Sequence, residues 1–380
     1  MKKKLLIIIP LIVVIVLASV IILAKTLTQK QEAAKDAWHQ VSVVVPDGAP
    51  LLPFAQFATS DDFTFNDGVL QLDDAFKEQL SKDVSVRVVS GPDQLASSLK
   101  QNMPDLAVVP VNLAAKLYND ADPKYQVVSV VTWGMNEIVG QAPVSNLSDL
   151  VGSTIYSFGK AETPGITLRT LLGESGVPYV DATWDTPVDG AKVNIIDLAT
   201  AQDIMAALPG SDPDKTFGLL PEPVATAFTA KNNAFSVGIN LQDVWKNVFD
   251  TPEYPQAVLV ANSDFLNQEG NAKFTEDFNS VLTLGEILAT EDPETAVNVL
   301  STKLNSTMFS AVNPGILAIK SKRLDIHNQP VFVSGGEGNS NESGQEAVMK
   351  YLEIIKDFSS DSAKLIGGEI PGEDFWAELK

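Results

Sequence analysis

The sequence predicts an α/β protein made of two successive units, each a mainly parallel sheet with crossover helices. Short β-branched runs alternate with amphipathic segments, and this order starts again near the middle of the chain. Gly, Pro, Asp and Asn separate the runs, as turn residues do. The 380 residues also exceed what one hydrophobic core usually organises, which favours two folded units.

In the first unit, strand, turn and helix follow one another three times. The expected strands are 41–45, 84–89 and 105–109, and the expected helices are 51–58, 93–101 and 113–119. Parallel strands need such crossover segments, so this order indicates a parallel sheet.

The second unit repeats the pattern. The expected strands are 125–132, 137–139, 153–157, 193–196 and 216–220, and the expected helices are 165–174 and 199–208. A last strand, 256–261, can return to the first unit. The rest of the chain to about residue 357 reads as mainly helical.

The N-terminus predicts a membrane anchor. Leu5 to Ala24 is a run of twenty residues without a charge, and Lys2, Lys3 and Lys4 precede it. Twenty residues at ~1.5 Å each can cross a bilayer, and the lysines leave everything after residue 25 outside the cytoplasm. A cleaved signal peptide is the alternative, although its apolar region is usually shorter, about 7–15 residues. Residues 1–25 are therefore read as the anchor and 26–39 as a polar spacer.

The charge excludes several classes of partner. Four of the 27 basic residues precede residue 26, so the rest of the chain carries 23 basic and 48 acidic residues, a formal charge of −25. Nucleic acid is therefore an unfavourable partner. The chain has no cysteine, which excludes disulfides and thiolate chemistry. We expect no cofactor, no metal and no catalytic residue, and we expect a monomer.

Several strand-to-helix turns carry binding chemistry. In an open parallel sheet, ligands lie beyond the carboxyl ends of the strands, near free backbone N–H groups. The turns at 46–50, 90–92, 110–112 and 159–164 stand at such points. Any α/β protein has turns of this kind, but their recurrence in both units favours a cleft between two sheets.

Two further residues leave alternatives open. Glu222 stands between Pro221 and Pro223, where it would cap the next helix. Its carboxylate either interacts favourably with the helix dipole or accepts a hydrogen bond from a ligand. Trp133 follows a β-branched run and precedes a glycine, so it is either core or a surface on which a planar ligand stacks.

Five segments, in order, resemble one family: VVVPDGAP (43–50), DLAVVPVNLAAKLYN (105–119), VVTWGMNEIVG (130–140), LSDLVGSTIYSFGKAETPGITLRTLL (147–172) and GLLPEPVATA (218–227). They are similar to the ABC-transporter solute-binding proteins of the nitrate, sulfonate, taurine and thiamine-precursor group. The ending SAKLIGGEIPGEDFW (362–376) is similar too. The resemblance covers roughly residues 40–380.

The resemblance implies a two-lobed type II periplasmic-binding-protein fold. Lobe one would be 40–133 plus 257–380, lobe two 142–254, and the hinge 134–141 and 255–256. The ligand would lie between the lobes, against Asp47, Gly48, Ala49, Ser90, Gly91, Val111, Asn112, Trp133, Lys160, Glu162, Thr163 and Glu222. Lys160 and Glu162 stand where the family more often has small residues, and no arginine is evident in the cleft, which argues against the family's anionic ligands.

The resemblance also implies a function and partners. The chain would capture a small polar or anionic organic solute by hinge closure, outside the cytoplasmic membrane, and deliver it to an ABC permease and its ATPase. A membrane-anchored solute sensor or adaptor is the alternative. An enzyme on the same fold is a third, but His39 lies in the spacer and His327 in a late loop, so neither histidine is expected to reach the cleft.

Overall fold

The computed structural model describes residues 40–59, 63–120, 124–324, 326–334, 342–358 and 360–379. The expected anchor at 5–24, the spacer at 26–39 and His39 lie outside these residues. Within the described part, none of the helices has both the length and the apolarity that a membrane crossing requires.

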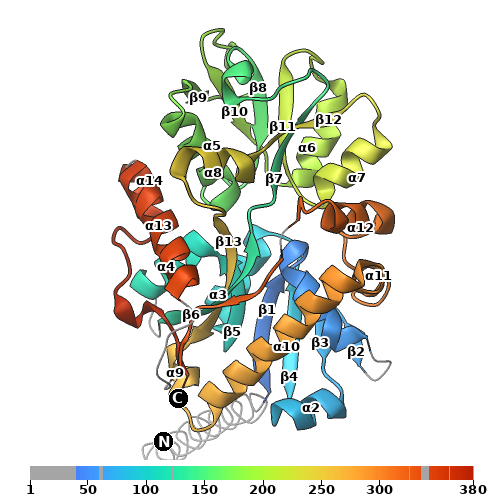
Figure 1. Cartoon of the computed structure of the whole chain (residues 1–380), viewed down its shortest axis with the longest axis vertical. Coiled ribbons are helices and arrows are strands. Elements are labelled where there is room, and N and C mark those ends of the chain that lie inside the picture. Colours follow the sequence, from blue (N-terminus) through green and yellow to red (C-terminus); the bar gives the residue numbers. More distant parts are fainter. Residues whose placement is uncertain are drawn as a thin grey trace, which may run out of the picture.

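The chain forms two lobes, each built on its own sheet (Figure 1). From edge to edge, the eight strands of the first sheet are β14 (Gln329–Pro330), β6 (Tyr125–Trp133), β13 (Pro255–Asn262), β5 (Leu106–Pro110), β1 (Val41–Pro46), β4 (Val84–Val89), β3 (Val69–Gln71) and β2 (Thr64–Asn66). The helical segments before and after the second lobe are η1 (Ala49–Ala58), α2 (Asp74–Leu80), α3 (Pro92–Asn102), α4 (Val111–Asp120), α9 (Ser263–Leu266), α10 (Asn271–Glu291), α11 (Pro293–Thr302), α12 (Val312–Lys320), α13 (Glu342–Phe358), α14 (Ser360–Lys364) and η4 (Glu373–Phe375). Two short strands, β15 (Val333–Ser334) and β16 (Glu378–Leu379), pair with each other.

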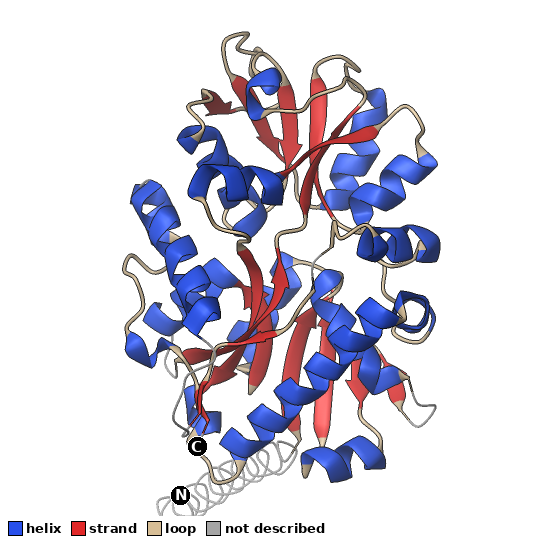
Figure 2. Cartoon of the chain, viewed as in Figure 1, coloured by secondary structure: helices blue, strands red, loops and turns tan. Residues whose placement is uncertain are grey.

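The second lobe is continuous in sequence. Its six strands, in sheet order, are β12 (Ser236–Asn240), β7 (Asn136–Gly140), β11 (Thr216–Pro221), β8 (Thr154–Ser157), β10 (Val193–Asp197) and β9 (Tyr179–Asp181). Its helical segments are η2 (Leu147–Leu150), α5 (Thr163–Glu174), α6 (Ala201–Ala207), η3 (Leu208–Gly210), α7 (Val224–Lys231) and α8 (Leu241–Phe249). Figure 2 shows helices on both sides of each sheet.

The predicted α/β class and its two sheets are confirmed. β1 runs parallel to β4 and β5, and β8 runs parallel to β10 and β11. The pattern-based placement of 125–132 in the second unit is wrong, because β6 pairs antiparallel with β13 in the first sheet. The structure also adds short strands that the sequence did not predict, among them β2, β3, β9 and β12.

Buried β-branched and aromatic residues hold the first lobe together. All eight residues of β13 are buried, which fits its place inside the sheet. On one side α10 packs against η1, where Phe57 and Phe278 stack with ring centroids 5.5 Å apart. Gly285 allows this close packing, since a Cβ there would lie 1.7 Å from the carbonyl oxygen of Pro53.

The two crossings between the lobes are hydrogen-bonded to each other. The N–H of Gly134 donates to the carbonyl of Tyr254 at 3.0 Å. The side chain of Asn136 donates to Gln256 Oε1 at 3.1 Å and to the Tyr254 hydroxyl at 3.3 Å. Gly134 suits this crossing, because a Cβ there would lie 2.5 Å from Cε1 of Tyr254, whose ring is fully buried.

Candidate functional site

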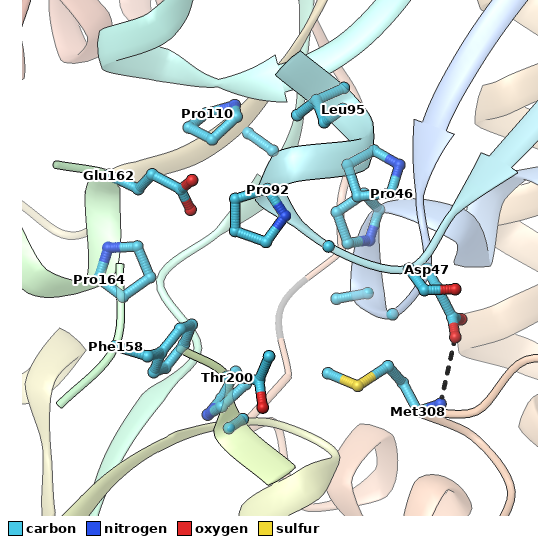
Figure 3. Close-up of a pocket in the computed structure, with 18 of the residues that line it drawn as sticks. Pro46, Asp47, Pro92, Leu95, Pro110, Phe158, Glu162, Pro164, Thr200 and Met308 are labelled. Carbon is cyan, nitrogen blue, oxygen red and sulfur yellow. Dashed lines mark hydrogen bonds between the residues drawn. The ribbon is translucent and has the colours of Figure 1, made fainter. Parts of the chain in front are cut away.

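A pocket of about 170 Å³ opens between the two lobes (Figure 3). Both lobes contribute strand ends and helix starts to its wall. The lining residues are Pro46, Asp47, Gly48, Ala49, Pro50, Ser90, Gly91, Pro92, Leu95, Pro110, Met135, Phe158, Glu162, Pro164, Ala199, Thr200, Ala201, Gln202, Pro221, Glu222, Gln256, Ala257 and Met308. An engineered cavity of ~150 Å³ accepts one benzene, so this pocket has room for about one small ring.

The turn after β1 forms one part of the first-lobe wall. The Asp47 carboxylate accepts hydrogen bonds from the N–H and hydroxyl of Thr307, both at 2.8 Å, and from the Ser306 hydroxyl. The N–H of Met308 donates to the same carboxylate at 3.4 Å (Figure 3). Asp47 therefore holds a segment about 260 residues away in sequence against the pocket, and places the Met308 side chain in the wall.

The turn after β4 forms a second part of that wall. Ser90, Gly91 and Pro92 lead into α3, and the Ser90 N–H donates to Gln94 Oε1 at 3.0 Å. Gly91 has an extended backbone with φ of 176°, and a Cβ built on it meets nothing within 4 Å. This position can therefore carry a larger side chain that would project without backbone strain.

Glu162 is the main charged group on the second-lobe wall. It occupies the N-cap position of α5, yet its side chain makes no capping hydrogen bond. Figure 3 shows its carboxylate directed into the pocket, near Pro164 and opposite Pro92. Burial raises the pKa of Glu162, and the charge of Asp93 raises it further. The fold therefore leaves a carboxylate with its acceptor sites directed at the cavity.

The start of α6 completes the second-lobe wall. Thr200 caps this helix by accepting from the N–H of Asp203, while the Asp203 carboxylate accepts from the Thr200 N–H and hydroxyl. The side-chain amide of Gln202 donates to the sulfur of Met308 at 3.4 Å. That contact joins the two lobes across the pocket.

Glu222 lines the pocket and is 1 % exposed. The sequence placed it at the N-cap of α7, but Pro223 holds that position, because the helix begins one residue later than expected. The Glu222 carboxylate instead accepts from the N–H of Thr226 at 3.1 Å and from the Thr226 hydroxyl at 2.9 Å. Burial raises the pKa of Glu222, while these bonds and the charge of Arg323 lower it.

A second carboxyl, Glu137, lies close to Glu222 but does not line the pocket. It is fully buried in β7, and Asn240 donates to its Oε1 at 2.8 Å, while Oε2 has no hydrogen-bond partner among the described residues. Burial and the charge of Glu222 raise the pKa of Glu137 to about 8.

Seven of the residues predicted from the sequence line this one pocket: Asp47, Gly48, Ala49, Ser90, Gly91, Glu162 and Glu222. Five do not. Val111 is fully buried in the core. Asn112 donates to the carbonyl of Ala161 at 3.1 Å and accepts from Thr163, so these two side chains link the lobes beside the pocket.

Lys160 and Trp133 are the other two outside the lining. Lys160 forms an ion pair with Asp181 at 2.6 Å, which turns its charge to the surface of the second lobe. Trp133 is 2 % exposed; its ring stacks on His327 and its N–H donates to the His327 carbonyl at 3.0 Å.

Several lining residues had no place in the sequence-based site, above all Met135, Phe158, Gln202 and Met308. The capping pattern of Thr200 and Asp203 could have pointed to Gln202 beside them. Nothing near Met308 in sequence could have done so, because its position depends on the long-range bonds to Asp47. Within the described residues, no group of three or more metal-ligating side chains comes together.

The fold, with this pocket between its lobes, was compared with known proteins. No family model and no curated protein matches the chain. Among solved structures, an ABC transporter protein from Parabacteroides distasonis is 22% identical with a TM-score of 0.64, over 90% of this chain and 100% of that one. The chain has the fold of ABC-transporter solute-binding proteins.

Two further structures have the same fold. The alkanesulfonate-binding protein of Xanthomonas axonopodis pv. citri, bound to MOPS, is 11% identical with a TM-score of 0.56, over 89% of this chain and 96% of that one. The periplasmic aliphatic sulphonate binding protein of Escherichia coli is 11% identical with a TM-score of 0.57, over 83% and 87%. The expected likeness to a type II periplasmic-binding-protein fold is thereby confirmed.

Proposed function

We propose that this chain is the solute-binding component of an ABC importer and takes a small organic solute into the pocket between its lobes. One observation carries the proposal: strand ends and helix starts from both sheets meet around a single pocket. The shared fold of the solute-binding proteins supports it.

The mechanism is closure of the two lobes about their crossings. A ligand that contacts both walls at once favours the closed arrangement, since it gains contacts there that the open arrangement lacks. The hydrogen bond between the Gly134 N–H and the Tyr254 carbonyl couples the two crossings. The Gln202–Met308 contact would have to change as the lobes move.

The remaining expectations belong to this proposal. Lobe one is 40–133 plus 257–380, lobe two 142–254, and the hinge 134–141 and 255–256. The division of the strands between two sheets supports the two lobes, while β7 (Asn136–Gly140) already pairs in the second sheet and β13 begins at Pro255 in the first. The chain is anchored through residues 5–24, faces away from the cytoplasm, acts as a monomer and serves an ABC permease with its ATPase.

A membrane-anchored solute sensor is the second candidate, because the same pocket and anchor would suit it. Enzyme activity has less support. Of the histidines, His327 stacks on buried Trp133 and pairs with Glu253 at 3.5 Å, and it does not line the pocket.

Binding and partners can be tested with the full chain purified in detergent. We expect the low-molecular-weight fraction of spent growth medium to raise its melting temperature; a ligand at 100 times its Kd stabilises a protein by about 2.7 kcal/mol. We also expect a permease and an ATPase to copurify. A copurifying kinase or cyclase instead would favour the sensor.

Two glycine variants show whether the pocket is responsible. Gly91→Leu should fill the pocket without backbone strain and abolish the stabilisation. Gly190→Leu is the matched control, because a Cβ there also meets nothing within 4 Å and the residue is outside the pocket. Stabilisation that survives Gly91→Leu, or that never occurs, would refute the proposed function.

A further inference from the structure

The charge of the pocket wall points to a class of ligand. Three acidic residues line it, Asp47, Glu162 and Glu222, of which Glu162 directs its carboxylate into the cavity (Figure 3), and none of the described lining residues is a lysine, arginine or histidine. Lys160 is paired with Asp181 on the surface of the second lobe. Arg323 is exposed and outside the lining, although its charge lowers the pKa of Glu222.

The helix N-termini around the pocket are already supplied with negative charge by the chain itself. Such termini attract anions, because their first N–H groups lack partners. Here α3 has Asp93 in its first turn and α5 has Glu162 at its N-cap. At α6 the Asp203 carboxylate accepts a hydrogen bond from the Thr200 N–H, and at α7 the Glu222 carboxylate accepts one from the Thr226 N–H. An anionic ligand would meet repulsion at each of these four ends.

Proline removes backbone donors from the same wall. Six lining residues are prolines: Pro46, Pro50, Pro92, Pro110, Pro164 and Pro221. Three of them, Pro50, Pro92 and Pro164, occupy the first or second position of η1, α3 and α5. Proline has no N–H, so the positions that would otherwise donate to a sulfonate or carboxylate cannot do so.

The rest of the wall suits an organic body. Leu95, Met135, Phe158 and Met308 line the pocket, and Figure 3 places the Phe158 ring beside Pro164 and facing the cavity. An aromatic face attracts cations as well as apolar groups. A bare metal ion fits poorly, because no cluster of three or more metal-ligating side chains occurs in the described part of the chain.

Resting on the proposed function, we propose that the ligand is a small organic cation, an amine, amidine or quaternary ammonium with an apolar body of about one ring. The Glu162 carboxylate faces the positive nitrogen, Glu222 and Asp47 add negative potential, and the apolar residues enclose the carbon frame. This assigns the pocket to a ligand of the opposite charge to the sulfonates named for two of the similar structures.

The test separates the ligand's charge from its identity. Low-molecular-weight extract of growth medium is divided on ion-exchange columns into cationic, neutral and anionic fractions, and each is added to the full chain in detergent. We expect the cationic fraction alone to raise the melting temperature. A defined panel of single-ring amines, amidines and quaternary ammonium ions, with carboxylates and sulfonates of matched shape, is measured in parallel by calorimetry.

Two variants connect the result to Glu162. Glu162→Gln keeps the shape of the side chain and removes its charge, so we expect cation binding to weaken about tenfold or more. Glu174→Gln removes the same charge from an exposed position at the other end of α5, and should leave binding unchanged.

Each other outcome decides against the inference. Stabilisation by the anionic or neutral fraction that Gly91→Leu abolishes would overturn the cation assignment and leave the proposed function standing. Cation binding that Glu162→Gln does not weaken would overturn the role of this pocket wall. If no fraction and no panel compound stabilises the chain, the proposed function falls together with the inference.

Discussion

Glu137 lies close enough to Glu222 for the charge of one to oppose ionisation of the other, and both carboxyls are buried at the crossing between the lobes. Glu222 has two hydrogen bonds from Thr226, whereas Glu137 has one from Asn240 and an unpaired Oε2. Glu137 is therefore the member of the pair that keeps its proton to higher pH. The charges of Arg323 and Asp243 act on it in opposite directions.

This pair makes stability depend on pH. The pKa of Glu137 is about 8 in the folded chain against an ordinary 4.5, so the folded state holds more protons between those values. The free energy of unfolding then falls as pH rises through this window. Each pKa unit corresponds to about 1.4 kcal/mol, so the loss is on the order of a few kcal/mol. Thermal unfolding at pH 5, 7 and 9 measures it.

The variant Glu137→Gln should flatten that dependence and leave the protein more stable than the wild type at pH 9. The carboxyls of half-buried Glu162 and buried Glu222, whose pKa values are also raised, should leave a smaller slope. Glu174→Gln serves as the charge-matched control and should keep the full slope. An unchanged slope in Glu137→Gln would show that another group titrates.

The strand-end turns of the pocket could be anticipated because parallel strands present their carboxyl ends at one edge of a sheet. β4 has the limits that its β-branched run predicts, 84–89, and the residues after it enter the wall as Ser90 and Gly91. The same reasoning predicted Asp47, Glu162 and Glu222 as lining residues, because each follows a strand of the sheets. A local sequence pattern is enough to predict a lining residue when its place in the pocket is set by the strand that precedes it.

The remaining features depend on partners far away in sequence, which a local pattern does not contain. Lys160 lies in the expected turn, but its ammonium group pairs with the Asp181 carboxylate at the surface of the second lobe. Trp133 ends β6 at the crossing, where the ring of His327 covers it. Met308 reaches the wall only because Asp47 binds its segment.

Asp47→Asn should loosen that segment. The change weakens the acceptor for the Thr307 N–H and hydroxyl and the Ser306 hydroxyl, and hydrogen bonds to a charged group contribute about 1.5–3 kcal/mol each, so we expect a loss of that order. Amide exchange at 306–308 should speed up, as followed by mass spectrometry. Asp67→Asn, in the exposed β2–β3 turn, should stay within about 0.5 kcal/mol of wild type. Protection at 306–308 equal to that of the wild type would contradict this role.

Arg169→Met tests the two ion pairs of a buried arginine on the second lobe. Arg169 is 8 % exposed, and its guanidinium donates to Asp181 at 2.8 Å and to Asp197 at 2.5 Å. Hydrogen bonds to a charged group contribute about 1.5–3 kcal/mol, and water compensates part of the charge left on Asp181 and Asp197, whose side chains are 41% and 23% exposed. We expect urea unfolding to show a loss of this size.

Lys160→Met is the matched comparison, since Lys160 pairs with the same Asp181 carboxylate but its side chain is 56% exposed. Exposed pairs contribute only about 0.2–1 kcal/mol. Equal effects of the two variants would mean that burial does not set the strength of these interactions.

Gly285→Ala tests the packing of α10 against η1. In an exposed helix this substitution stabilises by about 0.5–1 kcal/mol, because glycine loses more backbone freedom on folding. Here the added Cβ would lie 1.7 Å from the Pro53 carbonyl oxygen, and backbone cannot move aside as a side-chain tip does. Overpacking of this kind costs typically about 1–3 kcal/mol, so we expect net destabilisation in urea unfolding. Leu284→Ala, one residue away and 48% exposed, should change stability by no more than about 0.5 kcal/mol. A stabilised Gly285→Ala variant would show that α10 and η1 are further apart than these contacts require.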